Sequence, residues 1–303
     1  MKMRTVLPVI AAAAILTITG CSNAAPEPST SAPDSSSAPS TNTPTIESDA
    51  AAVALLPDAV KDSGTLVIGT DAAYPPNEYK DKDGKPIGWG VDLANAVGAK
   101  LGLETDWRVA KFENIIPSIT GGKMQMGSSS FTDNLERQKA VDFVNFYDAG
   151  ILWATKTGNT VDPDNACGLK VAVQTGTVQD TDDVPQKSEA CVAAGKEPIE
   201  KLKYEAQEEA TNAVVLGKAD AMSADSPITL YAIAQLDGKL EVAGKSFDTA
   251  PYGFATEKGS DMTKAVQAAL QSMMDDGSYT EILTEWGVQD GAIASATINA
   301  GNS

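Results

Sequence analysis

The sequence predicts an α/β fold after residue 57, because strand-like and helix-like runs alternate along that part of the chain. Two runs, Gly64–Asp71 and Leu169–Val173, are rich in apolar and β-branched residues and are typical of buried strands. The apolar residues of Phe112–Ile119 fall at positions i, i+3, i+4 and i+7, which predicts a helix with one apolar stripe. Alternation of this kind is typical of helices layered on mixed sheets.

Other segments complete this prediction. Further helices are expected at residues 91–101, 206–216, 227–236 and 260–286. The run Tyr74–Pro76 favours an extended loop, because proline fixes its own backbone and restricts the preceding residue. Asp81–Lys85 begins like a calcium-binding loop, but Pro86 stands where that loop requires glycine. We therefore interpret it as a hairpin turn.

The first 20 residues have the pattern of a targeting segment. Lys2 and Arg4 give a positive start, and the apolar run Val6–Ile18 is too short to span a bilayer as a helix. The run ends just before Cys21 in a string that resembles the bacterial lipobox, which implies that Cys21 becomes the first mature residue and carries lipid. The alternative is an ordinary secretory peptide in which Cys21 is incidental.

The next segment, Ser22–Pro57, is rich in Ser, Pro, Ala and Thr. Such a composition buries too little apolar surface to offset its ordering entropy, so we expect a disordered tether at 21–57. The remainder is long enough for one large domain or two lobes. It holds Cys167 and Cys191, an even pair for which an exported protein favours a disulfide, with two buried thiols as the alternative.

Composition excludes several functions. The chain has 23 Lys and Arg against 41 Asp and Glu, a net charge of −18, so no basic surface is available for nucleic acid. It contains no histidine, which excludes Ser-His triads and histidine metal sites. We expect neither a metal nor a cofactor.

Seven segments together carry a family resemblance. They are GTDAAYPP (69–76), GKPIGWGVDLANAVGAKLGL (84–103), FENIIPSI (112–119), SSFTDNLERQKAVDFVNFY (129–147), GLKVAVQTGT (168–177), ADAMSADSP (219–227) and PYGFATEKGSD (251–261). In this order and spacing, the chain resembles the type II periplasmic binding proteins for polar amino acids, such as the glutamine-binding and lysine/arginine/ornithine-binding proteins. It departs from the family pattern at Gly90, where the family has an acidic residue, and at Ser129-Ser130, where many members carry Ala-Gly.

The resemblance implies a two-lobe periplasmic-binding-protein-like type II fold with two crossover hinge strands. Lobe 1 would comprise residues 58–149 and 254–303, and lobe 2 residues 150–253 including the crossovers. Cys167 and Cys191 would both lie in lobe 2, where a disulfide stiffens that lobe without locking the hinge.

The resemblance also assigns the two charged poles of an amino-acid ligand. Arg137, with Ser130 and Thr132 at family spacing before it, would bind the carboxylate, because a guanidinium matches a carboxylate bidentately. Backbone N–H groups at a helix start there would add anion affinity. The alternative is a surface arginine paired with Glu136 or Asp142. Asp225 would bind the ammonium, its alternative role being the N-cap of the following helix.

The remaining positions would hold the rest of the ligand. Tyr74 and Phe112 match aromatic residues that sandwich the ligand side chain, although both also suit core packing. Asp71 would contact the polar end of that side chain, and Thr177 would add a hydroxyl and an N–H to the carboxylate. The Asp71 carboxylate favours an amide or a cation over an acidic ligand, so we expect glutamine or a basic amino acid. Gln174 replaces a lysine of the glutamine binder, which removes one charge and leaves the choice between these two open.

The resulting hypothesis is an extracytoplasmic, lipid-anchored, monomeric binding protein that delivers an amino acid to the transmembrane subunits of an ABC permease. One alternative is a lipid-tethered sensor that passes its closed form to a receptor. Another is a lyase on the same fold, with Asp71 and Glu78 as an acid–base pair. We expect no enzymatic activity.

Overall fold

The computed structural model describes residues 46–302, which belong to one compact unit. The expected signal peptide and Cys21 lie outside these residues, so the predictions made for them stay predictions. Within residues 46–302, every helix is too short or too polar to cross a membrane.

One nine-stranded sheet organises the molecule. Its strands are β1 (Thr65–Thr70), β5 (Glu104–Val109), β6 (Met126–Thr132), β7 (Val141–Lys156), β8 (Lys170–Gln174), β9 (Glu200–Tyr204), β10 (Ala221–Asp225), β11 (Leu240–Glu257) and β12 (Thr297–Ile298). The order is β5-β1-β6-β11-β7-β10-β8-β9, with β12 paired to β7. A separate three-stranded sheet contains β2 (Ala73–Tyr74), β3 (Glu78–Lys80) and β4 (Pro86–Ile87). The expected hairpin turn joins β3 to β4.

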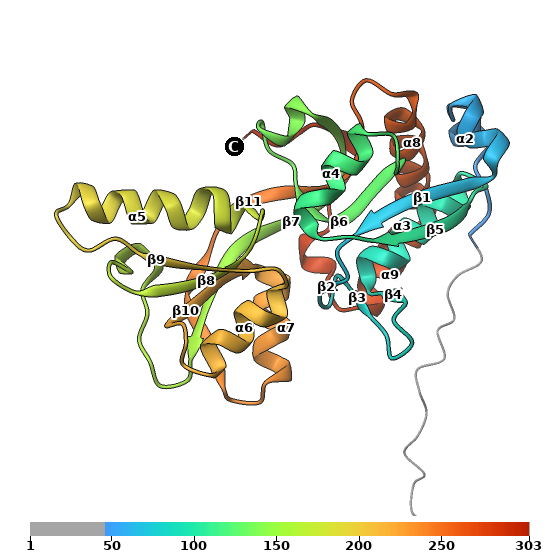
Figure 1. The fold of residues 1–303 in the computed structure, drawn as a ribbon. Coiled ribbons are helices and arrows are strands. Elements are labelled where there is room, and N and C mark those ends of the chain that lie inside the picture. The colour runs from blue at the N-terminus through green and yellow to red at the C-terminus, as the bar shows by residue number, and fades with distance from the viewer. Residues whose placement is uncertain (1–45, 303) are drawn as a thin grey trace, which may run out of the picture. The chain divides into compact units, whose positions relative to one another are not determined.

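Two long antiparallel strands, β7 and β11, join the two halves of the large sheet (Figure 1). The Val141 end of β7 and the Glu257 end of β11 belong with β1, β5, β6 and β12, which we call lobe 1. The other ends belong with β8, β9 and β10, which we call lobe 2. The β7–β11 register shifts at several points between Ala243 and Gly253. The predicted two-lobe fold with two crossover strands is confirmed.

Helices cover both faces of the sheet in each lobe. Lobe 1 carries α3 (Trp89–Lys100), α4 (Phe112–Thr120), α8 (Asp261–Asp276) and α9 (Ser278–Glu285). Lobe 2 carries α5 (Val184–Ala193), α6 (Gln207–Val215) and α7 (Ser226–Gln235). Along β1, Leu66 and Ile68 pack against α3 and α8, whereas Val67 packs on the α4 side. This alternation is the two-residue period of a strand buried on both faces.

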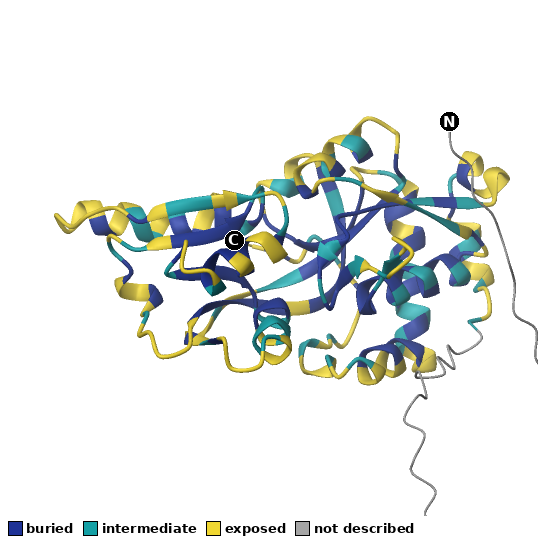
Figure 2. Ribbon diagram, turned by 60° about the horizontal axis from the view of Figure 1, so that its bottom comes forward, coloured by how far each residue is buried: buried dark blue, intermediate teal, exposed yellow. Residues whose placement is uncertain are grey.

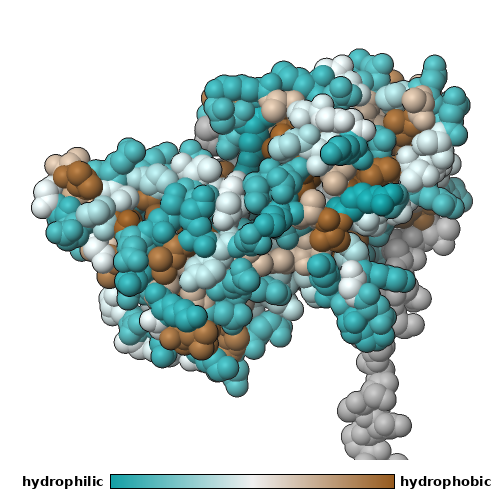
Figure 3. Space-filling model, in the orientation of Figure 1, coloured by the Kyte–Doolittle hydropathy of each residue, from teal (hydrophilic) through white to brown (hydrophobic). Residues whose placement is uncertain are grey.

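Exposure follows the same layering. Buried residues run along the central strands, and exposed residues lie on the outer helix faces and loops (Figure 2). The surface seen in Figure 3 is mostly hydrophilic, with small separate apolar areas. Such scattered apolar areas are normal for a folded surface.

The tether ends earlier than predicted. Residues 50–54 form helix α1 and Asp58–Ser63 form α2. Ala52 is fully buried against lobe 1, and the Asp49 carboxylate caps α1 by accepting from the N–H of Ala52 at 3.1 Å. The prediction of disorder is wrong for residues 46–57, because a capped helix packs onto the core through Ala52, with Leu56 buried beside it.

The expected helical segment 260–286 is two helices. Gly277 adopts φ 88° between α8 and α9, a left-handed conformation that ends the first helix. The sequence patterns did not predict helix α5 or strands β5 and β9. The short helical segments are η1 (Arg137–Lys139), η2 (Pro163–Asn165), the π-helix η3 (Gln179–Asp183) and η4 (Gln289–Gly291).

Cys167 and Cys191 form a disulfide within lobe 2. The two residues are 24 positions apart, and Cys191 is buried in the core cluster beneath α5. A loop of that length gives about 3 kcal/mol of stabilisation in the chain-entropy description. Because both cysteines belong to one lobe, the bond leaves the crossover strands unconstrained.

Candidate ligand-binding site

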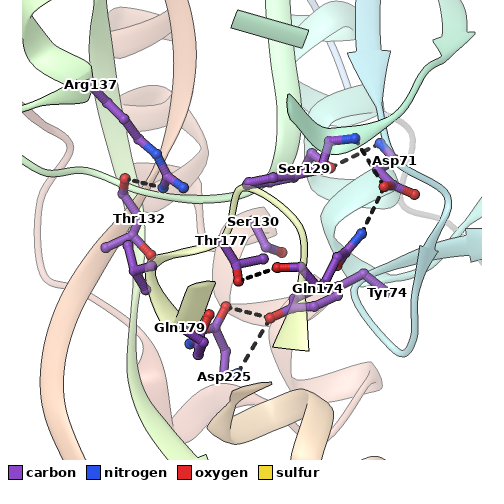
Figure 4. Close-up of a pocket in the computed structure, with 12 residues that line it drawn as sticks. Asp71, Tyr74, Ser129, Ser130, Thr132, Arg137, Gln174, Thr177, Gln179 and Asp225 are labelled. Carbon is purple, nitrogen blue, oxygen red and sulfur yellow. Dashed lines mark hydrogen bonds between the residues drawn. The ribbon is translucent and has the colours of Figure 1, made fainter. Parts of the chain in front are cut away.

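All nine residues predicted to hold a ligand line one pocket, together with Ser129, Val178 and Gln179 (Figure 4). Several of them stand at or just after strand ends: Asp71 follows β1, Thr132 ends β6, Gln174 ends β8 and Asp225 ends β10. β1 pairs in parallel with β6, and β8 with β10. Parallel strands present their carboxyl ends at one edge of a sheet, which is where open α/β folds place ligands.

The space enclosed by these residues is small. Its volume is about 10 Å³, which corresponds to about one water molecule. Side chains of the two lobes bond directly across it, including the Tyr74 hydroxyl to Asp225 at 2.8 Å and Gln174 Nε2 to Asp71 at 2.8 Å. A ligand as large as an amino acid therefore fits only when the lobes separate.

Asp225 receives three side-chain donors. Its Oδ2 accepts from the hydroxyls of Tyr74 at 2.8 Å and Tyr252 at 2.7 Å, and its Oδ1 accepts from Gln179 Nε2 at 2.7 Å. Although Asp225 precedes α7, its side chain makes no capping bond. The geometry therefore favours the pocket role of Asp225 over the alternative of a helix N-cap. Burial raises the pKa of Asp225. Burial and the adjacent Asp225 also raise the pKa values of Tyr74 and Tyr252, so both hydroxyls stay protonated as donors.

The Arg137 guanidinium is held by lobe 1 and already reaches lobe 2. Nη1 donates to the Thr132 carbonyl at 2.8 Å and Nη2 to the Gly176 carbonyl at 3.1 Å. Its Cζ lies 5.4 Å from the Phe112 ring centroid and 5.7 Å from that of Phe131. Burial lowers its pKa to about 10, so the guanidinium is charged at neutral pH.

The structure excludes the alternative of a surface arginine paired with Glu136 or Asp142. Glu136 pairs with Lys139, and Asp142 pairs with Lys258, so neither acid engages the arginine. The expected helix start is wrong: Arg137 opens a 3-10 turn of three residues, too short to add a helix dipole.

Asp71 lies at the other end of the pocket. Its Oδ2 accepts from the N–H of Phe112 at 3.1 Å and from Gln174 Nε2 at 2.8 Å. Burial raises the pKa of Asp71 to about 6, so the carboxyl is mainly ionised at neutral pH. Phe112 stacks on Phe131 with centroids 4.7 Å apart, so it lines the pocket and also belongs to the lobe 1 core.

Two predicted hydroxyls are already engaged within their own lobes. Ser130, at φ 48°, donates to Glu78 Oε2 at 2.9 Å and accepts from Asn77. The Thr177 hydroxyl donates to the Gln174 carbonyl at 2.8 Å. In this conformation, the expected offer of the Thr177 hydroxyl to the ligand is therefore replaced by a bond that shapes the loop.

Sequence reasoning missed several polar residues around the pocket. Gln179 points at Asp225 from the π-helix, and Tyr252 reaches it from the crossover strand β11. Tyr252 belongs to the quoted string PYGF, which was the available signal, whereas no sequence pattern predicts a π-helix. Glu78, named from the sequence as a possible acid–base partner of Asp71, is fully buried, and burial raises its pKa to about 8. A Cβ at Gly90 would lie 2.2 Å from Glu78 Oε1, which explains the glycine at this departure from the family pattern.

Comparison with known proteins shows to which family the chain belongs. Residues 66–289 match the bacterial extracellular solute-binding proteins, family 3. The chain belongs to this family. It is 44% identical over 248 residues to the arginine-binding protein ArgT of Corynebacterium glutamicum, covering 81% of this chain and 82% of that protein.

A more distant relative and a solved structure extend the comparison. The ABC transporter glutamine-binding protein GlnH of Bacillus subtilis is 29% identical over 244 residues, covering 77% of this chain and 85% of that protein. An ancestral arginine-binding protein solved with arginine has a TM-score of 0.68 and 31% identity. That alignment covers 74% of this chain and 98% of the ancestral protein.

Proposed function

We propose that this protein is the substrate-binding component of an ABC amino-acid importer and that its ligand is a basic amino acid of the arginine type. The observation that carries the proposal is the placement of three charges around one pocket. Arg137 comes from lobe 1, Asp225 from lobe 2, and Asp71 lies at the far end. The first two match the carboxylate and ammonium of an amino acid, and the third is left for its side chain.

The charges of the pocket favour a cationic ligand over a neutral one. The lining holds two carboxyl groups, Asp71 and Asp225, and one guanidinium, so it carries one negative charge in excess when both carboxyls are ionised. A basic amino acid carries one positive charge and neutralises that excess. Its guanidinium would pair with Asp71 and stack on the aromatic rings beside it. The family relatives named for arginine support this choice.

Glutamine is the second candidate ligand. Gln174 and Asp71 together offer an amide donor and a carboxylate acceptor at 2.8 Å from each other, which suits an amide side chain. GlnH, a relative named for glutamine, belongs to the same comparison. We rank glutamine second because it leaves the excess carboxylate charge unbalanced.

Binding would act by stabilising the closed arrangement of the lobes. A bound ligand replaces the cross-pocket bonds of Tyr74, Gln174 and Arg137 with bonds from both lobes to itself, so only the closed form satisfies all of its groups. In this proposal, the lobes are residues 58–149 with 254–303 and residues 150–253, and lobe 1 also includes residues 46–57. The closed form is what an ABC permease would receive.

The cellular setting is extracytoplasmic, as in the family to which the chain belongs. We infer that Cys21 carries lipid and anchors a monomeric binding protein to the membrane. A sensor role would use the same closed form with a receptor in place of a permease, and genes for a permease and an ATPase beside this one would favour transport. A lyase role is disfavoured by position: Glu78, the suggested partner of Asp71, is buried behind Ser130 and does not line the pocket.

Isothermal titration calorimetry against the twenty amino acids tests the proposal. We expect arginine to bind most tightly, lysine and glutamine more weakly, and glutamate not at all. Arg137→Gln should abolish measurable binding, whereas Arg108→Gln, a matched change at an exposed arginine paired with Asp106, should bind like the wild type. If the folded wild-type protein gave no binding heat with any of the twenty amino acids, the proposal of an amino-acid ligand would be refuted.

A further inference from the structure

The segment that follows η4 lies beyond the family match, which ends at residue 289. This segment returns along the crossover strand β7: Thr297 and Ile298 pair antiparallel with Asn145 and Val144. Asn299 continues the ladder, since its N–H donates to the Phe143 carbonyl at 3.0 Å. In Figure 1, the red end of the chain, marked C, lies beside the green segment that follows β6. We call residues 297–301 the tail.

The tail ends on a buried aspartate. Asp133 is fully buried, and its Oδ2 accepts from the N–H of Gly301 at 2.9 Å and from Asn145 Nδ2 at 2.9 Å. Its Oδ1 accepts from Gln138 Nε2 at 2.7 Å, and the same nitrogen donates to the Gly301 carbonyl at 2.8 Å. The peptide groups of Gly301 are therefore bonded to both Asp133 and Gln138.

These two residues flank the arginine of the candidate site. Asp133 follows Thr132, whose carbonyl accepts from Arg137, and Gln138 comes directly after Arg137. The Asp133 N–H also donates to the Pro251 carbonyl on β11 at 2.8 Å. The loop 132–138 is thus held on one side by a crossover strand and on the other by the tail.

We propose that the tail is a positioning element that holds the loop 132–138 so that Arg137 presents its guanidinium to the ligand carboxylate. The inference rests on the proposed function, because it needs Arg137 to bind that carboxylate. It adds a residue far along the chain, Gly301, whose backbone orients the site without touching the ligand. Bidentate binding of a carboxylate by a guanidinium depends on the angle between the two groups as well as on their distance. The residues that orient the guanidinium therefore influence affinity.

Gly301 lies so close to Asp133 that the single methyl group of an alanine would test this contact. A Cβ at this position would lie 1.9 Å from the Asp133 carbonyl oxygen and 2.5 Å from its carbon, both backbone atoms. Neither atom can move away unless the loop or the tail shifts. The next residue, Asn302, is exposed and serves as the matched control position.

The experiment measures arginine binding by titration calorimetry and stopped-flow dissociation in the full chain. Gly301→Ala should weaken affinity about tenfold, mainly through faster dissociation, because the hydrogen bonds that align the loop are lost. Asn302→Ala should bind like the wild type. Gln138→Leu removes the same link from the loop side and should reproduce the loss if Gly301→Ala folds poorly. Hydrogen exchange at residues 133–138 should rise in both variants.

A double-mutant cycle separates positioning from general destabilisation. In an Arg137→Lys background, Gly301→Ala should have little further effect, because the bidentate contact that the tail aligns is already gone. An equal loss in both backgrounds, or wild-type binding by Gly301→Ala and Gln138→Leu, would overturn the tail's role while leaving the proposed function intact. A wild-type protein that binds no amino acid would instead overturn both together.

Discussion

Replacing Asp71 with asparagine should convert an arginine site into one that prefers glutamine. The substitution keeps the shape of the side chain, and an amide oxygen can still accept from the Phe112 N–H and Gln174 Nε2. What it removes is the charge that would face the ligand guanidinium. A hydrogen bond to a charged group contributes about 1.5–3 kcal/mol, so we expect arginine affinity to fall by about 10- to 150-fold.

The same substitution should change stability in a pH-dependent way. Burial raises the pKa of Asp71 from 3.8 to about 6, which makes the folded state hold this proton more tightly than the unfolded state. The Asp71 carboxyl alone should therefore contribute a loss of about 3 kcal/mol of stability as pH rises from about 4 through 6. The introduced asparagine does not titrate. Without ligand, the variant should accordingly unfold at a higher temperature than the wild type at pH 8, with a smaller difference at pH 4.

The assays are calorimetric titration with arginine and glutamine at neutral pH, and thermal unfolding without ligand at pH 4 and pH 8. Asp106→Asn, at a partly exposed aspartate outside the pocket, is the matched control and should change neither ligand preference nor the pH dependence. Unchanged arginine affinity in Asp71→Asn would refute the assignment of Asp71 to the ligand side chain. It would leave the roles of Arg137 and Asp225 standing.

Other expected outcomes follow from the same structure. Arginine binding by the wild type should weaken as pH falls below about 6, because the Asp71 carboxyl becomes protonated, and titrations from pH 8 to 5 that show constant affinity would contradict this. Tyr252→Phe removes one of three donors to Asp225 and should weaken binding about tenfold; calorimetry showing wild-type affinity would exclude that contribution. Replacing both Cys167 and Cys191 with serine should lower the free energy of unfolding by about 3 kcal/mol while leaving affinity unchanged, as measured by urea unfolding and calorimetry. Ala52→Asp should destabilise lobe 1, because it places a charge at a fully buried position, whereas an unchanged melting temperature would mean that α1 does not pack there.

Much of the architecture could be predicted from local pattern. The apolar stripe of α4, the strand β1 and the hairpin after β3 follow from periodicity and turn residues, which act over a few positions. The order and spacing of the family segments added the two lobes. The same reasoning failed at residues 46–57, where a composition typical of disorder packs as a short capped helix. Its burial depends on contacts with α3 and α8, far along the chain.

The sequence by itself determined which residue types are available to the site: one guanidinium, two carboxylates and their aromatic neighbours at the ends of strands. Only the tertiary structure decided which way each side chain points. Ser130, at φ 48°, donates to Glu78, and Asp225 meets Tyr74 across 151 residues of chain. The contact of Gly301 with Asp133 spans 168 residues. Such contacts arise when the sheet and its crossover strands bring distant segments together, and no local pattern of residues encodes them.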